Sequence, residues 1–495
     1  MIHPVAMSRD SPITPFHSIG GGARESRGWR TRRLTTPAEG SNVLRAYGVA
    51  SGDCDPRRRV PMSRWATVSR RGFMKSAGVV GAAVGGLTVL GASARGQAAK
   101  AFKVGLIGCG GRGRGAIGDI SNAGKALNVD IQIVALADAM PDRVAAAREG
   151  VKARGQEVPE NRCFSGFDAY KKLLDTDVEI VLMCTSPNFR PAHFEAAVKA
   201  GKHVFVEKPV AVDAPGCRRM LAAGEEAAKK NLGVLAGTCL RHDKGYGAMH
   251  QLIAEGTIGR VMGGTTYYCT ARLWSRPRGE GMTDAEYMVR NWANFAGMSG
   301  DHIVEQDVHT IDMQNWCVGA TPIAVVAIGG RHRRLTGDQY DSFSVDYEYP
   351  NQIHVHNICR QINGCWSWGN GVHLVGEKGW ARIGAGVTLW DGTKVKAPDV
   401  PMQGSMYIQE HCVLLKSLLD GKPINHVKDV TESTLSAIMG RDAAYTGRRI
   451  EWKEYMDPEA KSDLYDKAYA TASEDFESGR VVAPKDDVVP IPGKA

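Results

Sequence analysis

A chain of 495 residues with 43% hydrophobic and 23% charged residues has the composition of an ordinary folded protein, and its length allows two or three domains with substantial cores. The formal net charge of +9 is concentrated at the front: residues 1–99 hold 15 of the 62 Lys and Arg and 5 of the 53 Asp and Glu, which leaves 47 against 48 in the rest. Residues 100–495 are therefore nearly neutral, and their charge does not point to a nucleic-acid or membrane partner.

The front of the chain has two parts. Residues 1–61 are rich in Arg, Ser, Gly and Pro without helical or strand periodicity, and we interpret them as disordered, or as an untranslated extension if Met62 is the true start. Residues 62–99 contain the pair Arg70–Arg71, a mild apolar run and the small residues Ala92-Ser93-Ala94. This order is typical of a signal peptide, and the arginine pair resembles the twin-arginine class.

The signal segment predicts where the protein works. A membrane anchor is the alternative, because residues 76–94 carry no charge, but their five glycines make a poor span. We therefore expect a periplasmic or extracytoplasmic protein, with the twin-arginine export machinery as a partner. That route carries proteins already folded, so any cofactor would travel inside the chain. Unusually tight cofactor binding is the consequence.

A glycine turn follows the first apolar strand. The segment AFKVGLIG, residues 101–108, is rich in β-formers, and Gly108, Gly110 and Gly113 have GxGxxG spacing before a helical stretch. Gly108 allows the tight turn, Gly110 lets the backbone approach a pyrophosphate, and Gly113 lets helix and strand pack closely. The phosphates would lie at the positive end of the helix. The residues that we assign to this part of the dinucleotide site are Gly108, Gly110, Gly111, Arg112 and Gly113.

A second strand, residues 131–138, ends in Asp138, whose carboxylate we expect to bind the adenosine ribose hydroxyls. An acid here favours NAD, because it would repel the 2′-phosphate of NADP, although Arg112, Arg114 and Arg143 leave NADP open. Apolar strands at 178–187, 203–209 and 232–238 then alternate with amphipathic stretches at 190–200 and 213–230. The alternation predicts an α/β fold with an N-terminal Rossmann domain, a doubly wound parallel sheet, over residues 100–240.

Glu207-Lys208-Pro209 closes the strand at 203–209 at its carboxyl end, where open α/β sheets bind ligands. Together with GCGGRG, ALAD, TSPN followed by His193, and EGTIGRV, this motif resembles the Gfo/Idh/MocA oxidoreductases over roughly residues 101–455. The resemblance implies that Lys208 reaches the substrate hydroxyl beside the nicotinamide, with a solvated surface lysine as the alternative. Further cofactor contacts are assigned to Thr185, Pro187, Asn188 and Glu207, although 185–188 could also be a purely structural turn.

Residues 299–319, SGDHIVEQDVHTIDMQNWCVG, are predicted to form one helix on which Glu305, His309 and Asp312 share a face. In the family that the chain resembles, an acid precedes a histidine base by four residues and a further acid follows it by three. The resemblance makes His309 the general base and Asp312 a substrate or orienting carboxylate, while Glu305 departs from the usual Asp. A zinc site or a core histidine is the alternative, and we expect no metal.

Period-2 strands at 342–350 and 352–362 predict a second, α+β domain over residues 241–455, with a large mixed or antiparallel sheet that would cover the nicotinamide. Helices are expected at 405–420 and 429–447, and a partly extended tail at 456–495. Aromatic, Arg and Asn residues gather in 271–302 and 363–370, which suits a polyhydroxylated ring. Substrate contacts are assigned to Arg241, Trp274, Arg290 and Trp292. A Trp-rich interface of a homo-oligomer explains this composition nearly as well.

The sequence contains eleven cysteines, none of them in CxxC spacing. Cys109, Cys184 and Cys239 lie in or beside apolar runs, so we expect buried free thiols, with a bridge between Cys359 and Cys365 as an alternative after export.

The predicted activity is that of an exported oxidoreductase moving a hydride between a secondary hydroxyl of a sugar, sugar derivative or cyclitol and a bound nicotinamide dinucleotide. If the cofactor cannot leave, a second substrate must restore it. One alternative is an NAD-dependent glycosidase of the same fold, although the glycosidases of this type lack the lysine of EKP. Another is a non-catalytic binding protein that keeps the dinucleotide as a structural part.

Overall fold

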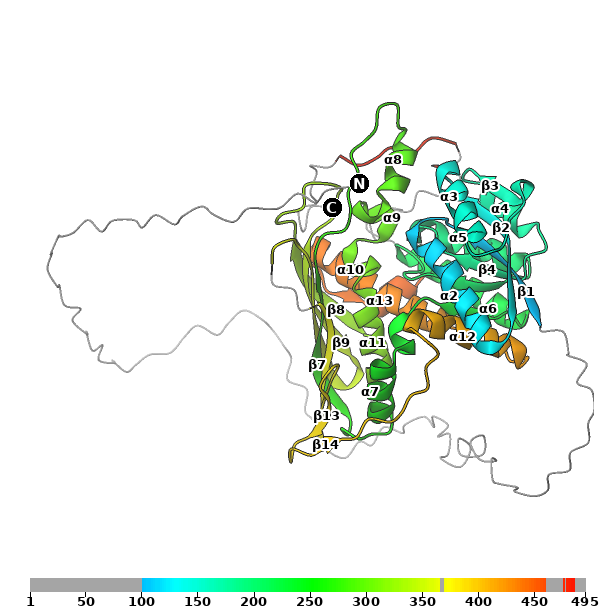
Figure 1. Ribbon diagram of the computed structural model, residues 1–495. Coiled ribbons are helices and arrows are strands. Elements are labelled where there is room, and N and C mark those ends of the chain that lie inside the picture. The colour runs from blue at the N-terminus through cyan, green and yellow to red at the C-terminus, as the bar shows by residue number, and fades with distance from the viewer. Residues whose placement is uncertain (1–99, 366–368, 460–474, 477, 486–495) are drawn as a thin grey trace, which may run out of the picture. The chain divides into compact units, whose positions relative to one another are not determined.

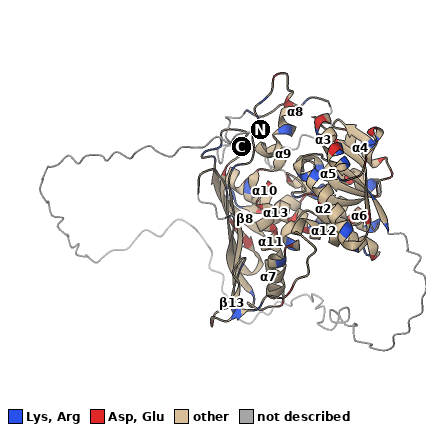
Figure 2. Cartoon of the chain, viewed as in Figure 1, with Lys and Arg blue, Asp and Glu red and all other residues tan. Residues whose placement is uncertain are grey.

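The computed structural model describes residues 100–365, 369–459, 475–476 and 478–485. The segments predicted to be disordered (1–61) and to act as a signal (62–99), and most of the tail from 460, lie outside the described residues. Within the described part, no helix combines the length and the apolar character needed to cross a bilayer. Lys and Arg are interspersed with Asp and Glu over the drawn helices and strands (Figure 2), in keeping with the near-neutral charge of this part of the sequence.

The first domain is built on a six-stranded parallel sheet (Figure 1). Its order is β3 (Cys163–Ser165), β2 (Asp130–Asp138), β1 (Ala101–Ile107), β4 (Ile180–Met183), β5 (His203–Val206) and β6 (Val234–Ala236). The chain reverses its direction of winding between β1 and β4, and ligands of doubly wound sheets bind outside the carboxyl ends of the strands at such a point. The predicted Rossmann sheet is confirmed, although the short strand β3 had no sequence signal.

Helices cover both faces of this sheet. The helices α2 (Gly111–Leu127) and α3 (Pro141–Lys152) pack on one face, while α4 (Ala169–Leu174), α5 (Arg190–Lys199) and α6 (Ala214–Lys229) pack on the other. These helices bury both faces of the sheet. The strands β1, β4 and β5 are accordingly almost continuously apolar, as the sequence predicted.

The second domain contains a nine-stranded mixed sheet. Its order is β14 (Lys394–Val395), β13 (Gly386–Leu389), β12 (Gly379–Arg382), β11 (Gly369–Gly376), β7 (Val261–Thr270), β10 (Ile353–Gln361), β9 (Ser342–Tyr349), β8 (Ala324–Gly330) and β15 (Ile450–Glu451). Only β7 and β10 pair in parallel. Alternate residues of β9 are buried, which confirms the period-2 pattern.

The inner face of the large sheet is covered by helices that lie between it and the Rossmann domain (Figure 1). These are α7 (Lys244–Ala254), α10 (His302–Glu305), α11 (Val308–Val318) and α13 (Val427–Thr446). Before α13 the chain returns to the first domain: α12 (Met406–Leu419) buries Leu414, Leu415 and Leu418 in the core that α2 shares. The helices predicted at 405–420 and 429–447 are therefore present.

A small apolar cluster joins the two domains beside the glycine turn's edge of the parallel sheet. It combines Phe189 of the first domain with Met288 and Val289 of α8 (Asp284–Arg290) in the second. Phe476 of the tail, 2% exposed, packs into it with its ring centroid 4.9 Å from that of Phe189. The tail is thus anchored at this point of the molecule.

One expectation about local structure is wrong, and one alternative is excluded. Residues 299–319 do not form one helix: α10 ends at Glu305 and α11 begins at Val308, because Gln306 and Asp307 use their side chains in hydrogen bonds to Thr270, Gln361 and Thr310. The alternative of a Cys359–Cys365 bridge also fails, because all ten cysteines in the described part of the chain are free thiols.

Candidate active site

A cavity of about 640 Å³ lies at the carboxyl edge of the parallel sheet, within the range typical of ligand sites. Both domains line it. The first contributes the glycine turn, the ends of β2 and β4, and Glu207 and Lys208 after β5. The second contributes residues of β7, the segment around Trp274 and Trp292, and the break between α10 and α11.

The glycine turn has the shape that a dinucleotide needs. Gly108 has φ +96°, and a Cβ on it would lie 2.5 Å from the carbonyl carbon of Cys184. A Cβ on Gly113 would lie 1.9 Å from the carbonyl oxygen of Gly108, so any side chain there would push α2 away from β1. A Cβ on Gly110 would meet no atom of the chain within 4 Å, and Gly110 and Gly111 line the cavity. The backbone is therefore open to a close ligand where a pyrophosphate would bind.

Asp138 lies at the end of β2 and lines the cavity. One carboxylate oxygen accepts the Cys109 N–H at 2.7 Å and the other accepts the Met140 N–H at 2.9 Å. Burial raises the pKa of Asp138, and these two hydrogen bonds oppose that rise. Each oxygen retains a second lone pair, so the carboxylate can still accept from ribose hydroxyls. The residues here fit NAD.

Glu207 and Arg112 form an ion pair at the cavity wall. Arg112 Nε donates to Glu207 Oε1 at 2.6 Å, and its Nη2 donates to Asp119 at 2.9 Å. Glu410 of α12 is fully buried behind them, 3.9 Å from Arg112, and burial together with the charge of Glu207 raises its pKa well above the usual value. Glu207 therefore supports Arg112 and the floor of the cavity as well as facing its interior.

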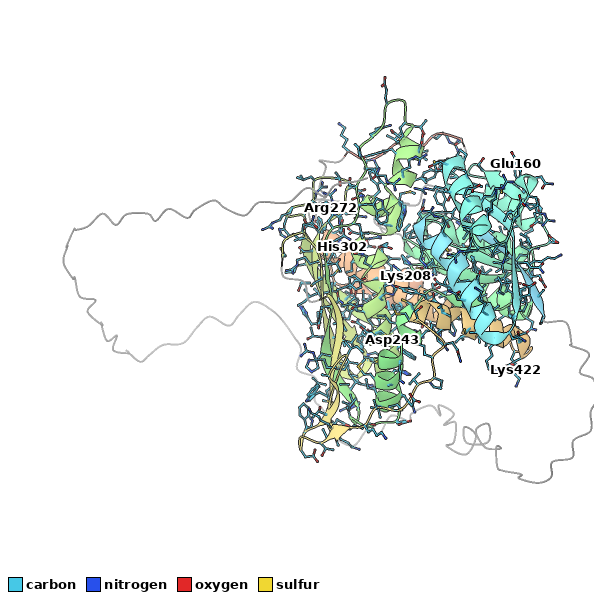
Figure 3. All side chains as sticks on the ribbon, in the orientation of Figure 1. Glu160, Lys208, Asp243, Arg272, His302 and Lys422 are labelled. Atoms are coloured by element: carbon cyan, nitrogen blue, oxygen red, sulfur yellow. The ribbon has the colours of Figure 1, made fainter. Side chains whose placement is uncertain are left out.

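Lys208 meets the second domain across the cavity. Its Nζ donates to the main-chain carbonyl oxygen of Glu305 at 2.5 Å and to Glu305 Oε1 at 3.2 Å. Figure 3 shows Lys208 in the middle of the molecule, where the two domains face each other. Both side chains of the pair are 13% exposed, so the contact is largely shielded from solvent. The side chain of Glu305 thus reaches Lys208, so glutamate in place of the family's usual aspartate keeps an acid in contact with the lysine.

His309 lies on the first turn of α11 and lines the same cavity. Its Nδ1 is buried and has no hydrogen-bond partner within the described part of the chain. Burial lowers the pKa of His309 well below the usual 6.5, and the positive charge of Lys208 lowers it further. The imidazole is therefore neutral near pH 7 and can accept a proton.

Asp312 does not face the cavity, contrary to the expectation of one shared helix face. It is 1% exposed and accepts two hydrogen bonds from Arg241, each at 2.8 Å, as well as one from the Ser433 hydroxyl. Arg241 also pairs with Asp429 at 3.0 Å and stacks on Trp316. Neither member of this pair is among the residues that line the cavity. Asp312 follows His309 by three residues on α11, but its carboxylate is bound by Arg241 and Ser433, and helical spacing could not reveal these contacts.

The other predicted contacts divide into two groups. Trp274 and Trp292 line the cavity, with their ring planes at 70° and centroids 5.9 Å apart. Arg290 does not line it but forms a bidentate ion pair with Asp142 of α3, which ties α8 to the Rossmann domain. In the TSPN turn, Thr185 lines the cavity, whereas Pro187 and Asn188 are buried behind the wall.

Sequence reasoning missed several polar residues of the wall, among them Arg190, Tyr268 and Gln306. Arg190 is 4% exposed, and one guanidinium nitrogen donates to the Pro209 carbonyl oxygen while Nε has no partner. Tyr268 of β7 lies with its ring centroid 6.4 Å from that of His309. Gln306 occupies the break between α10 and α11. Gln306 was detectable only as the residue after Glu305, and nothing in the pattern of β7 distinguished Tyr268. Among the described residues, no group of three His, Cys, Asp or Glu side chains is arranged to hold a metal.

Comparisons with known proteins agree with this geometry. The family profile described as "Oxidoreductase family, NAD-binding Rossmann fold" matches residues 102–235, and the GFO/IDH/MocA C-terminal domain profile matches residues 246–382. Inositol 2-dehydrogenase of Rhizobium meliloti is 30% identical over 236 residues, which are 47% of this chain and 62% of the relative. The inositol 2-dehydrogenase of Salmonella paratyphi B is 26% identical over 51% of this chain and 66% of the relative. The chain thus matches less than two thirds of each relative's length.

Solved structures share the fold. Aldose-aldose oxidoreductase from Caulobacter crescentus superposes with a TM-score of 0.55 at 19% identity, covering 71% of this chain and all of that one. The scyllo-inositol dehydrogenase from Lactobacillus casei gives a TM-score of 0.52 at 20% identity over 71% of this chain and 98% of that one. With a Rossmann sheet, a dinucleotide-shaped glycine turn and both family profiles in order, the chain belongs to the Gfo/Idh/MocA family of oxidoreductases with an NAD-binding Rossmann fold.

Proposed function

We propose that this protein is an exported oxidoreductase that transfers a hydride between a secondary hydroxyl of a sugar, sugar derivative or cyclitol and a tightly bound NAD. The observation that carries the proposal is the contact of Lys208 with Glu305 in the cavity that His309 and the glycine turn also line. A permanent hydrogen-bond donor, a neutral base and a dinucleotide cradle in one enclosure are the parts that alcohol oxidation requires.

Oxidation of a secondary alcohol removes a hydride from carbon and a proton from oxygen. Bound NAD supplies the hydride acceptor. The chain has to take only the proton, and neutral His309 is the group suited to accept it. Lys208, held by the oxygens of Glu305, can donate a hydrogen bond to the alcohol oxygen and stabilise the negative charge that develops there. In the reverse direction the protonated His309 returns the proton to the carbonyl oxygen, while Lys208 again donates a hydrogen bond to that oxygen.

The proposed substrate class rests on the cavity wall and on the relatives. Trp274 and Trp292 offer aromatic faces beside polar groups, the combination that suits a ring with apolar faces and hydroxyl edges. The matched relatives include inositol 2-dehydrogenases, whose substrate is a cyclitol. These observations favour a polyhydroxylated ring over a linear aliphatic alcohol.

Retention of the cofactor is supported by contacts among residues beside and along the cavity wall. The Arg290–Asp142 pair and the packing of Phe476 against Phe167 and Phe189 connect three separate segments beside Asp138, where the adenosine would bind. Phe167, Phe189 and Asp142 all line the cavity. These contacts hold three segments together beside the proposed adenosine site, which supports slow exchange of the cofactor and a second substrate that restores it.

Purified full-length protein tests the proposal. We expect it to release nicotinamide dinucleotide on denaturation, and the bound cofactor to be reduced or oxidised by one member of a panel of sugars, cyclitols and keto-sugars. A preparation that lacks nicotinamide and works only with added free NAD would contradict tight binding. Failure of every panel member to change the redox state of NAD would contradict the activity.

Export and assembly belong to the same proposal. The arginine pair at residues 70–71 and the uncharged run after it support the twin-arginine route. Replacement of both arginines by lysine should leave the protein in the cytoplasm, as cell fractionation would show, and unchanged export of that variant would contradict the route. A homo-oligomer is proposed as well, and light scattering of the purified protein would decide it.

A further inference from the structure

We propose that Gln306 is a specificity-determining residue, which presents one fixed amide N–H donor to an oxygen of the substrate. The inference rests on the proposed oxidoreductase function and deepens it. Gln306 lines the cavity between Glu305, which holds Lys208, and His309. Its position alone makes contact with a substrate plausible, but its orientation makes the contact specific, because neighbouring groups decide which end of the amide faces inward.

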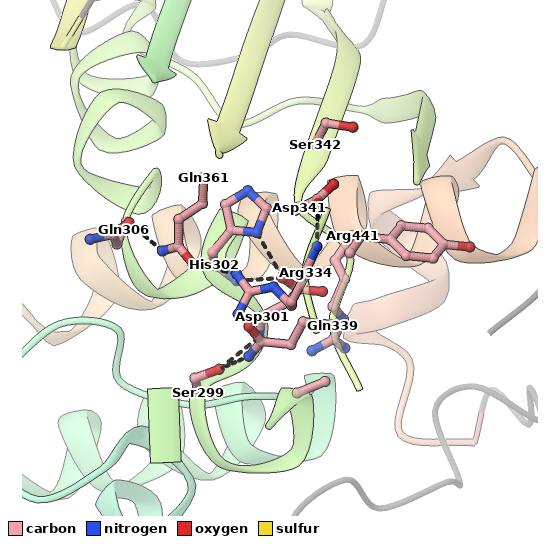
Figure 4. A network of polar contacts seen from close by, with 12 residues as sticks. Ser299, Asp301, His302, Gln306, Arg334, Gln339, Asp341, Ser342, Gln361 and Arg441 are labelled. Atoms are coloured by element: carbon pink, nitrogen blue, oxygen red, sulfur yellow. Dashed lines mark hydrogen bonds and ion pairs between the residues drawn. The ribbon is translucent and has the colours of Figure 1, made fainter. Parts of the chain in front are cut away.

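The orientation is set by a buried relay of hydrogen bonds that begins at Arg334 (Figure 4). A guanidinium can only donate hydrogen bonds. Arg334 Nη2 donates to Gln361 Oε1, so the Nε2 of Gln361 must point away from Arg334. That Nε2 donates to Gln306 Oε1 at 2.8 Å. Arg334 therefore sets the orientation of both amides, because its guanidinium cannot accept a hydrogen bond.

A second donor reinforces the result. The hydroxyl of Thr270 donates to the same Gln306 Oε1 at 3.3 Å, so both lone pairs of this oxygen are engaged within the chain. A flipped Gln306 would turn its NH₂ group toward the NH₂ group of Gln361, and a donor would face a donor in a buried setting. Gln306 Nε2 is thus the end left for the cavity, and it has no acceptor among the described residues.

The relay is held rigidly at its source. Arg334 is 5% exposed, and its main-chain N–H donates to Asp341 at 2.9 Å. Its Nη1 donates to Asn294 Oδ1 at 3.4 Å, and Asn294 Nδ2 donates to the Trp274 carbonyl oxygen at 3.0 Å. Arg334 therefore orients Gln306 and also supports the segment that carries a tryptophan of the cavity wall. Gln306 and Trp274, on two walls of the proposed substrate site, are thus both connected by hydrogen bonds to the buried Arg334.

The consequence is a requirement for an acceptor at one position of the substrate. A hydroxyl or carbonyl oxygen beside Gln306 satisfies the donor, whereas a deoxy analogue leaves the N–H unpaired in a closed site. Sites built to hydrogen-bond a substrate oxygen reject the analogue that lacks it. The enzyme should therefore discriminate against removal of the oxygen at one position of the ring.

The test pairs enzyme variants with deoxy analogues of the best substrate found for the wild-type protein. We expect the wild type to lose about 10- to 100-fold in kcat/KM with the analogue that lacks the contacted oxygen. In Gln306→Met this discrimination should fall to within about 2-fold at that position alone. Gln361→Met frees the Gln306 amide to flip and should weaken the same discrimination less. Gln251→Met, at an exposed position of α7, should leave it unchanged.

Two further readings separate the possible failures. An identical deoxy profile in the wild type and Gln306→Met, or a wild type that discriminates at no position, would overturn the inference while the oxidoreductase function stands. A wild type that oxidises nothing in the panel would remove the function itself. Gln306→Glu serves if the methionine variant does not fold, because it keeps the bonds from Gln361 and Thr270 but presents an acceptor, and it should lower kcat/KM for the intact substrate while the content of bound dinucleotide stays unchanged.

Discussion

The ammonium nitrogen of Lys208 lies 2.5 Å from the main-chain carbonyl oxygen of Glu305, although 97 residues separate the two in sequence. The lysine comes from the loop after β5 of the parallel sheet, and Glu305 ends α10 beneath the mixed sheet. A carbonyl oxygen and a carboxylate oxygen together fix the direction of the ammonium group. The lysine is therefore positioned by the second domain, and the reacting centre exists only when both domains are folded.

Replacement of Lys208 should separate an enzyme from a scaffold. We expect Lys208→Met to lower kcat by about 10²- to 10⁴-fold with bound dinucleotide retained, because the variant loses a donor to the reacting oxygen but leaves the glycine turn intact. Stopped-flow absorbance of the nicotinamide would measure this. Lys244→Met is the matched control, since Lys244 is exposed and forms an ion pair with Asp399 outside the site. Equal turnover in both variants would favour the non-catalytic alternative.

Alanine substitutions at Gly113 and Gly110 should affect different properties, the first stability and the second NAD binding. Gly113→Ala should lower the melting temperature, because its Cβ would lie 1.9 Å from the Gly108 carbonyl oxygen. Gly110→Ala should leave the melting temperature of the cofactor-free protein unchanged but weaken NAD binding, since its Cβ meets only open space within the chain. Calorimetry and the content of bound NAD report the two effects. Loss of stability in both variants, with NAD binding intact, would argue against a dinucleotide at this turn.

The Asp312–Arg241 pair should behave as a structural element. Asp312→Asn leaves a buried guanidinium with an incomplete partner, and we expect the free energy of unfolding to fall by up to about 3–5 kcal/mol, with little change in KM of the folded protein. Urea unfolding and steady-state kinetics measure the two quantities. A raised KM at unchanged stability would restore the substrate role that the family resemblance assigned to Asp312.

The pH dependence should reflect the environment of His309. The base must be neutral to accept a proton, and burial together with Lys208 lowers its pKa well below 6.5. Activity should therefore persist as the pH falls through 6.5 and decline only below it. In Lys208→Met one of the two causes is gone, so the acid limb of the residual kcat/KM should move to higher pH. An acid limb that stays in place in this variant would show that the two groups are not coupled.

Phe476 offers a test of cofactor retention. Phe476→Ala removes the ring that packs on Phe167 and Phe189, and we expect bound NAD to be lost faster during gel filtration. Phe476→Leu keeps part of the apolar contact and should lie between the wild type and the alanine variant. Identical NAD contents in all three proteins would show that the tail does not help to retain the cofactor.

The resemblance of several motifs to the family assigned Lys208 and His309 to one site. The sequence by itself determined the Rossmann domain and the glycine turn with Asp138. These features depend on local rules, because a strand, a turn and a helix of given residue types can bind phosphate wherever they occur. The period-2 strands of the second domain were visible for the same reason.

Only the tertiary structure decided the direction of the polar side chains. Gln306 lies at the cavity in the two-residue break between α10 and α11, and Asp312 of α11 is bound by Arg241. Neither arrangement has a signature in helical periodicity. The partners that cause the break, Thr270 and Gln361, lie on separate strands of the large sheet. Hydrogen bonds between distant segments outweigh the weak preference of two residues to continue a helix, so the orientation of this part of the site is fixed by contacts that sequence spacing does not contain.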